Sequence, residues 1–201
     1  MRVAICSMVL LSIPATWAVD KDNGKFKPGV ASSYKGAQTL EGITIAAVPY
    51  ITAQQSASAF GKVHPYEHGI LPVLVLIENK TGKTVRADLN AEFVDLSNRH
   101  AEAVPPQDVM YMGANKKPPT IPGTGPSPIP LPRRNKKGPL NTYEIEGRAF
   151  VAKLIPAGEA VHGFVYFQTS FKEGSKLYVS GLKDPSTGKD YFYFEVPIER
   201  Q

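Results

Sequence analysis

The chain has 201 residues, with 23 Lys and Arg against 18 Asp and Glu, and a single cysteine, Cys6. Its length is enough for one domain with its own hydrophobic core. One cysteine excludes an internal disulfide framework and zinc sites built from several thiolates. Side-chain packing must therefore hold the fold together.

The first eighteen residues have the pattern of a secretory signal peptide. Arg2 supplies a positive charge, residues 3–13 form an apolar stretch too short to span a bilayer, and the small side chains of Thr16 and Ala18 fit a cleavage site. We therefore expect an exported protein, periplasmic or secreted, that loses Cys6 and with it any thiol chemistry. A retained membrane anchor is the alternative.

The next part of the chain is predicted to change from irregular to regular structure. Residues 19–40 are polar, rich in Gly, Lys and Ser, and without a period, which predicts a flexible N-terminal arm. Thr52 and Gln55 form a capping-box pattern that predicts one short helix ending near Gly61. A nearly unbroken apolar run at 70–77 predicts a strand buried on both faces.

The clearest strand pattern covers residues 85–93, where apolar residues alternate with polar ones, as in a half-buried antiparallel strand. Four further strands are predicted after a Pro-rich stretch: 148–155, 160–169, 176–182 and 191–198. In the last of them, the even-numbered residues from Phe192 to Ile198 are expected to face the core. Many short strands with turns between them predict an all-β fold, an antiparallel two-sheet immunoglobulin-like sandwich over residues 41–201; a barrel is the alternative.

Three motifs support this expectation. They are Val75-Leu-Ile-Glu-Asn-Lys-Thr-Gly-Lys-Thr84, Ala91-Glu-Phe-Val-Asp95 and Ile155-Pro-Ala-Gly-Glu-Ala-Val-His-Gly-Phe-Val-Tyr-Phe167. Together they resemble the turn and strand signatures of secreted bacterial immunoglobulin-like domains of the DUF4352 kind. The resemblance covers roughly residues 43–198. It implies a fold and an envelope or extracellular location, and it carries no catalytic residues.

The net positive charge of +5 comes from one Pro-rich loop, residues 113–141, which contains six bases, eight prolines, four glycines and no acid. Its six bases are Lys116, Lys117, Arg133, Arg134, Lys136 and Lys137. Without these six and Arg2, 16 bases stand against 18 acids, so the remainder of the chain is slightly acidic. A disordered insertion, a segment that docks to a protein partner and an electrostatic tether to an anionic envelope component are the alternatives. Nucleic acid is disfavoured by the compartment and because no aromatic residue in the loop could stack on bases.

The sequence offers one candidate for metal chemistry. His64-Pro-Tyr-Glu-His68 matches the H-x-x-E-H pattern of zinc proteases, which requires both histidines on one face of a helix. Pro65 and Gly69 disfavour such a helix, so we expect a plain turn. Glu144 and Glu146 are expected on a solvated face of an extended segment, and we predict no metal, no cofactor and no catalytic residue.

The tyrosines are a further candidate surface. If exposed together, they could bind a partner, although tyrosines more often line sheet faces and cover the edge of the core. The residues in question are Tyr111, Tyr143, Tyr191 and Tyr193. We favour the structural interpretation.

These observations predict an exported, non-catalytic binding protein of the cell envelope that contacts a protein or anionic partner through the six loop bases. One alternative is a metal-dependent accessory hydrolase that uses His64, Glu67 and His68. The other is a structural envelope subunit that polymerises through exposed edge strands.

Overall fold

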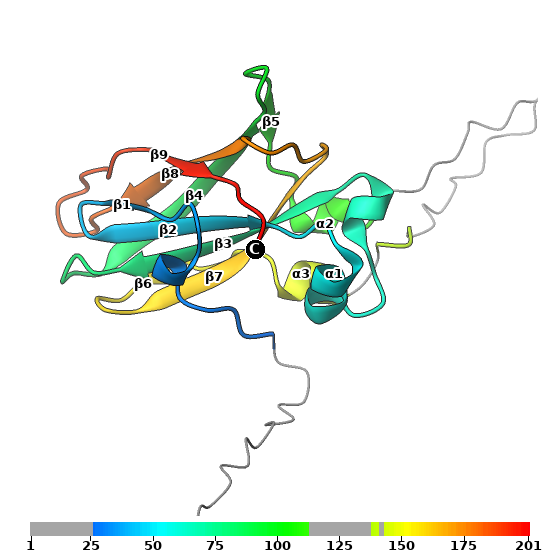
Figure 1. Cartoon of the computed structure of the whole chain (residues 1–201). Helices are drawn as coiled ribbons and strands as arrows, with labels where there is room; N and C mark the ends of the chain where they lie inside the picture. Colours follow the sequence, from blue (N-terminus) through cyan, green and yellow to red (C-terminus); the bar gives the residue numbers. More distant parts are fainter. Residues whose placement is uncertain (1–25, 113–137, 141–142) are drawn as a thin grey trace, which may run out of the picture.

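The computed structural model describes residues 26–112, 138–140 and 143–201 (Figure 1). The predicted signal peptide and the six loop bases lie outside these residues. The strands are β1 (Gln38–Leu40), β2 (Ile43–Pro49), β3 (Leu71–Asn79), β4 (Val85–Val94), β5 (His100–Glu102), β6 (Leu154–Ile155), β7 (Ala160–Phe167), β8 (Lys176–Lys183) and β9 (Phe194–Pro197). The helices are α1 (Ala53–Phe60), α2 (Pro106–Val109) and α3 (Tyr143–Gly147), with 3-10 helices η1 (Ala31–Ser33) and η2 (Pro65–His68).

The strands form two antiparallel sheets. The four-stranded sheet has the order β1-β2-β3-β7, and the five-stranded sheet has the order β5-β4-β8-β9, with β6 also paired to β4. The three α-helices gather at one end of the sandwich (Figure 1). The prediction of an all-β, antiparallel two-sheet sandwich is confirmed, with three short α-helices in the described residues instead of one. No helix in the described ranges is long and apolar enough to cross a membrane.

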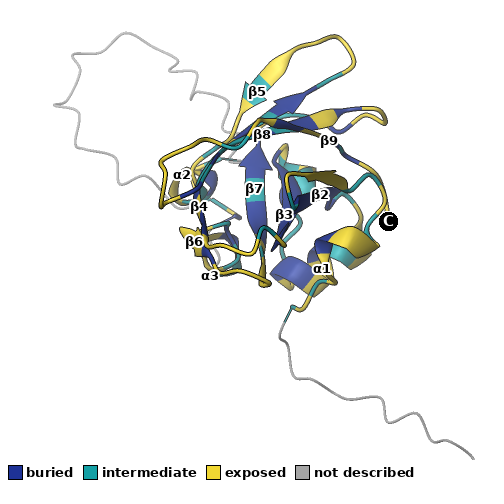
Figure 2. Ribbon diagram, turned by 90° about the vertical axis from the view of Figure 1, so that its left-hand side faces the viewer, coloured by how far each residue is buried: buried dark blue, intermediate teal, exposed yellow. Residues whose placement is uncertain are grey.

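Strand β3 lies in the middle of the molecule, and each of its residues is buried. Its odd-numbered residues, such as Val73 and Val75, pack into the core between the two sheets. Its even-numbered residues Leu74 and Leu76 pack into a second core on the other side of the same sheet. Figure 2 shows this burial along β3 and β7. The apolar run in the sequence therefore predicted correctly a strand buried on both faces.

The second core lies under the helices. Phe60 of α1 and Ile145 of α3 pack against Phe164 and Tyr166 of β7. The ring centroids of Phe60 and Phe164 are 4.7 Å apart. The Tyr166 hydroxyl donates a hydrogen bond to the Ile145 carbonyl at 2.7 Å, which satisfies a polar group in an apolar site. The predicted capping box that starts α1 is also confirmed, because the Gln55 backbone N–H donates to Thr52 Oγ1 at 3.2 Å.

The predicted alternation along β4 is confirmed, with an interruption in the middle. Ala87 and Ala91 are both buried, as expected for residues four apart in a strand, but the pairing of β4 with β8 shifts register between Ala87 and Asn90. Gly181 of β8 lies opposite this bulge with a φ of +84°. A Cβ atom at Gly181 would come within 2.0 Å of the Asp88 carbonyl oxygen, so only glycine fits there.

The prediction of a flexible arm over 19–40 is wrong for its described part. The backbone N–H and the hydroxyl of Ser32 donate to Glu78 Oε1 at 3.0 and 2.9 Å, and Lys80 forms an ion pair with the same carboxylate at 2.9 Å. Burial would raise the pKa of Glu78, but these hydrogen bonds outweigh it and hold the pKa below its usual value. The polar residues of this segment thus attach it to β3, and strand β1 pairs with β2.

Three further predictions are corrected. Of the strand expected at 148–155, only Leu154–Ile155 forms a strand, because residues 143–147 form α3 and Ala149 makes only an isolated parallel bridge to Phe164 of β7. Glu144 and Glu146 therefore lie on a helix and not on an extended segment. Phe192 was expected in the core but is 63% exposed, because β9 begins only at Phe194.

Candidate functional site

The H-x-x-E-H motif, for which we predicted a plain turn, lies in and beside the short helix η2. Glu67 is exposed, and His64 Nδ1 is buried without a hydrogen-bond partner in the described structure. Across the described residues, no three His, Cys, Asp or Glu side chains lie close enough together to hold a metal ion. The segment is one turn of 3-10 helix followed by Gly69 in the left-handed conformation, so it does not continue into the longer helix that the zinc chemistry requires.

A different group of residues comes together on the outer face of the five-stranded sheet. In β8, Tyr178 and Ser180 are half-buried and alternate with the buried residues Leu177 and Val179. Side chains of a strand alternate between the two faces, so Tyr178 and Ser180 point away from the core. The partner of Ser180 in β4 is Asn90.

The same row continues over the neighbouring strands. Tyr178 pairs with Glu92 of β4 on one side and with Glu195 of β9 on the other. Directly paired side chains on one face are in contact distance of each other. Tyr193, just before β9, alternates with the buried Phe194 and shares this outer face.

Three rings cross this face, and we call them the aromatic row: His100, Tyr178 and Tyr193. The centroids of Tyr178 and Tyr193 are 6.2 Å apart with planes at 39°, and those of His100 and Tyr178 are 5.8 Å apart, edge to face. Both distances lie in the range of favourable ring contacts. Tyr193 is 62% exposed, so a large part of its ring is open to a partner.

A shallow hollow of about 120 Å³ opens beside the aromatic row. It is lined by Asn90, Glu92, Tyr178, Val179, Ser180 and Tyr193. The lining combines two tyrosine rings with an amide, a carboxylate and a hydroxyl, which together can donate and accept hydrogen bonds. The hollow is smaller than the roughly 300–1,000 Å³ of a pocket for a drug-sized ligand, so it can take one small group of a larger partner.

The charged side chains around the aromatic row are paired with each other. His100 Nδ1 lies 2.9 Å from Glu92 Oε2, and Lys176 Nζ lies 3.0 Å from Glu195 Oε2. The hydrogen bond that Lys176 donates to the Glu195 carboxylate raises the pKa of Lys176 and favours the charged ammonium. These pairs hold the polar side chains in place beside the rings without leaving a strong net positive charge.

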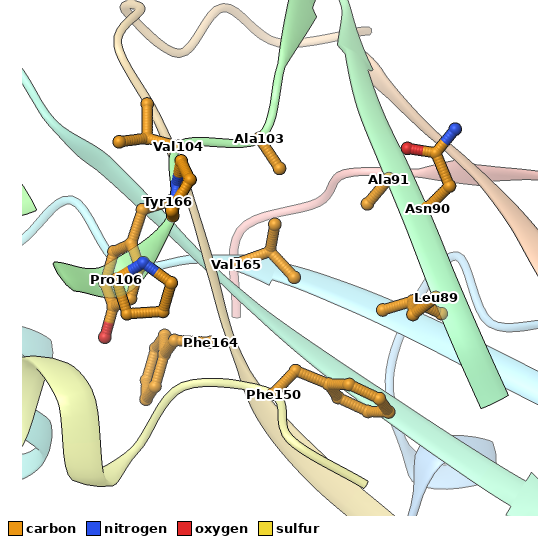
Figure 3. Close-up of a pocket in the computed structure, with 11 residues that line it drawn as sticks. Leu89, Asn90, Ala91, Ala103, Val104, Pro106, Phe150, Phe164, Val165 and Tyr166 are labelled. Carbon is orange, nitrogen blue, oxygen red and sulfur yellow. The ribbon is translucent and has the colours of Figure 1, made fainter. Parts of the chain in front are cut away.

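A second cavity, of about 210 Å³, lies where the edges of the two sheets approach each other (Figure 3). The side chains that point into it are those of Leu89 in β4, Val165 in β7, and Phe150, which lies between α3 and β6 (Figure 3). It lies beside β4 between the stretches that pair with β6 and with β5. Its lining side chains are mainly apolar and include no Asp, Glu, His, Lys or Arg, so it offers packing and no ordinary acid–base pair.

Of the candidate tyrosines, only Tyr193 belongs to the aromatic row. Tyr143 is exposed on α3, and Tyr191 packs partly against the core. The sequence prediction missed Tyr178 and His100. The signal for Tyr178 was present in the alternation of polar and apolar residues at 176–182, but its contact with His100 depends on strands that are far apart in the sequence.

No protein-family model matches this chain, and no curated protein matches it in sequence. The resemblance to DUF4352 domains therefore stays a prediction.

Proposed function

We propose that this chain is an exported, non-catalytic binding domain of the cell envelope, and that the outer face of its five-stranded sheet is the recognition surface. The aromatic row carries this proposal. Large exposed rings on a regular sheet add little to a monomer's core, whereas tyrosines are enriched at contact surfaces because they combine apolar area with a hydrogen-bonding group. The signal-peptide pattern of residues 1–18 supports export.

The rigidity of the sheet supports the same surface. Tyr178 lies on β8, which is paired on both sides, and Glu92 lies on β4, whose neighbours are β8 and β5. Residues on paired strands lose little conformational freedom when a partner binds, which favours affinity. Recognition residues on such a sheet are held in place before the partner arrives.

The six loop bases are proposed as a second contact, for an anionic envelope component. They lie outside the described residues, but the two flanks of their segment are held together. The Gly138 backbone N–H donates to the Met110 carbonyl at 2.9 Å, and Val109 and Leu140 are buried beside these flanks. The two described flanks of the basic segment therefore meet at one place, beside α2. Clustered Lys and Arg side chains attract anionic surfaces.

Affinity capture from a cell-envelope extract tests the proposal. The bait proteins are the mature chain, the double variant Tyr178→Ala/Tyr193→Ala, a variant with Gln at the six loop bases, and Tyr143→Ala as a matched control. Tyr143 is 84% exposed on α3, so its removal tests the loss of an exposed tyrosine elsewhere on the molecule. We expect the double variant to lose a component that the control retains. Equal recovery by the double variant and the mature chain would refute the sheet face as the recognition surface.

A further inference from the structure

We infer that the outer face of the five-stranded sheet binds a neutral polysaccharide, with a sugar ring stacked on Tyr193 beside the hollow. This inference rests on the proposed function and names its ligand class. A pyranose ring presents a face of C–H groups and a rim of hydroxyls that both donate and accept hydrogen bonds. A matching site needs an aromatic face with donors and acceptors beside it.

The described residues supply both parts of such a site. Tyr193 offers a ring that is 62% exposed, and Tyr178 lies beside it at 6.2 Å. The hollow between them is lined by Asn90, Glu92 and Ser180, which offer an amide, a carboxylate and a hydroxyl. An amide and a carboxylate can each contact two neighbouring hydroxyls, which fixes the orientation of the ring on the tyrosine.

The charges close to the rings disfavour a protein as the partner. The core of a protein interface is depleted of charged residues and becomes dry on binding. Here Glu92 pairs directly with Tyr178 from β4, and Glu195 pairs with it from β9. A partner protein would have to desolvate both carboxylates, which is costly. A sugar keeps them hydrogen-bonded through its hydroxyls.

The same charges disfavour an anionic ligand on this face. Lys176 and His100 are each within 3.0 Å of a carboxylate oxygen, of Glu195 and Glu92 respectively. An anion would have to compete with these carboxylates for the Lys176 ammonium and for the His100 ring nitrogen. In addition, Glu102 of β5 lies directly opposite Glu92 in the sheet. The face is therefore suited to a ligand without charge.

The dimensions indicate a chain and not a single sugar. A hollow of about 120 Å³ has the volume of about four water molecules and takes only part of a sugar unit. The aromatic row continues beyond it from Tyr193 through Tyr178 to His100, across β8 to β5. A ligand that lies along this row can make repeated contacts, as a polysaccharide does, whereas a free monosaccharide would use only one.

Binding is measured by affinity gel electrophoresis and by titration calorimetry with the mature protein. The neutral probes are hydroxyethyl cellulose, xyloglucan, chitohexaose and the neutral polysaccharide fraction of the cell envelope, and alginate is the anionic probe. We expect binding to at least one neutral probe, weakened about three- to tenfold by Tyr193→Ala and further by Tyr178→Ala/Tyr193→Ala. Tyr193→Trp should retain binding, and Tyr143→Ala should leave it unchanged.

Two further readouts separate stacking from charge and from misfolding. Binding of a neutral chain should persist when the salt concentration rises from about 0.1 to about 1 M, since screening weakens only charge-based contacts. Thermal unfolding of Tyr193→Ala should match that of the parent, because its ring is largely exposed. Asn90→Ala tests the polar part of the hollow and should weaken binding without a change in salt dependence.

The outcomes distinguish this inference from the proposed function. If no neutral probe binds and the double variant loses a protein from the envelope extract, the sheet face is a recognition surface but the polysaccharide inference is wrong. If alginate alone binds, and only the six-base variant loses it, the inference is also wrong. If the double variant retains every ligand of the mature chain, both proposals fail.

Discussion

The close contact at the bulge between β4 and β8 predicts that replacing Gly181 lowers the free energy of unfolding. Substitution by alanine places a Cβ atom 2.0 Å from the Asp88 carbonyl oxygen and 2.9 Å from the Asp88 carbonyl carbon. Both are backbone atoms, so no side chain can move aside. Gly181 also has a φ of +84°, which an alanine adopts only at a cost of about 1–2 kcal/mol. Forced displacement of packed atoms adds about 1–3 kcal/mol.

Gly188 is a matched control for the backbone contribution. Its φ of +72° is similar, but a Cβ atom there would meet nothing within 4 Å. Gly188→Ala should therefore cost only the conformational part, about 1–2 kcal/mol, and Gly181→Ala should cost about 1–3 kcal/mol more. For a chain of this size the difference corresponds to a Tm lower by about 2–12 °C.

Urea unfolding of both variants, followed by circular dichroism, gives the two free energies of unfolding. Equal destabilisation of Gly181→Ala and Gly188→Ala would refute the close contact at the bulge. Because Asn90 and Ser180 pair just beside this bulge, Gly181→Ala should also disturb the hollow on the outer face. A variant that unfolds early but binds as the parent does would contradict that link.

Two other predictions concern polar groups in the core. Hydrogen bonds lower the pKa values of Glu78 and Asp184 in the folded state. The free energy of unfolding that these two carboxylates contribute is therefore fully present above the usual carboxylate pKa of about 4. It is lost as the pH falls through their lowered pKa values in the folded protein. Glu78→Gln should flatten this acid limb of the stability curve measured by chemical unfolding, and an unchanged limb would contradict the role of Glu78. Asn79 is fully buried, and its Nδ2 donates to the carbonyls of Lys83, Ile155 and Pro156 at 2.6, 2.8 and 3.0 Å. Asn79→Ala should lower the free energy of unfolding by about 3 kcal/mol through the unpaired carbonyls, and a loss below about 1 kcal/mol would refute this.

Local patterns in the sequence predicted the centre of the fold. The apolar run of β3, the alternation of β4 and the capping box at Thr52 each depend only on residues close together in the sequence. Each of them is found in the structure. The regular structure of residues 26–40 and their attachment to β3 could not be predicted from neighbouring residues. It depends on Glu78, which is 46 residues from Ser32 in the sequence.

The candidate site illustrates the same limit. Tyr178 and Tyr193 lie together because β8 pairs with β9, and Asn90 joins them only through the pairing of β4 with β8. Alternation predicts which face a side chain takes, but not which strand lies beside it. The prediction that Phe192 is buried was wrong for a related reason. Its place in an alternating pattern did not reveal that β9 begins two residues later.

The hydrogen bond between Gly138 and Met110 has a consequence for engineering this protein. It joins the two flanks of residues 113–137 at one point of the fold. The entropic free-energy cost of closing a loop rises slowly with the loop's length, by only about 0.6 kcal/mol for each doubling. We therefore expect that a foreign peptide spliced between these two flanks, beside α2, would cost the sandwich little folding free energy.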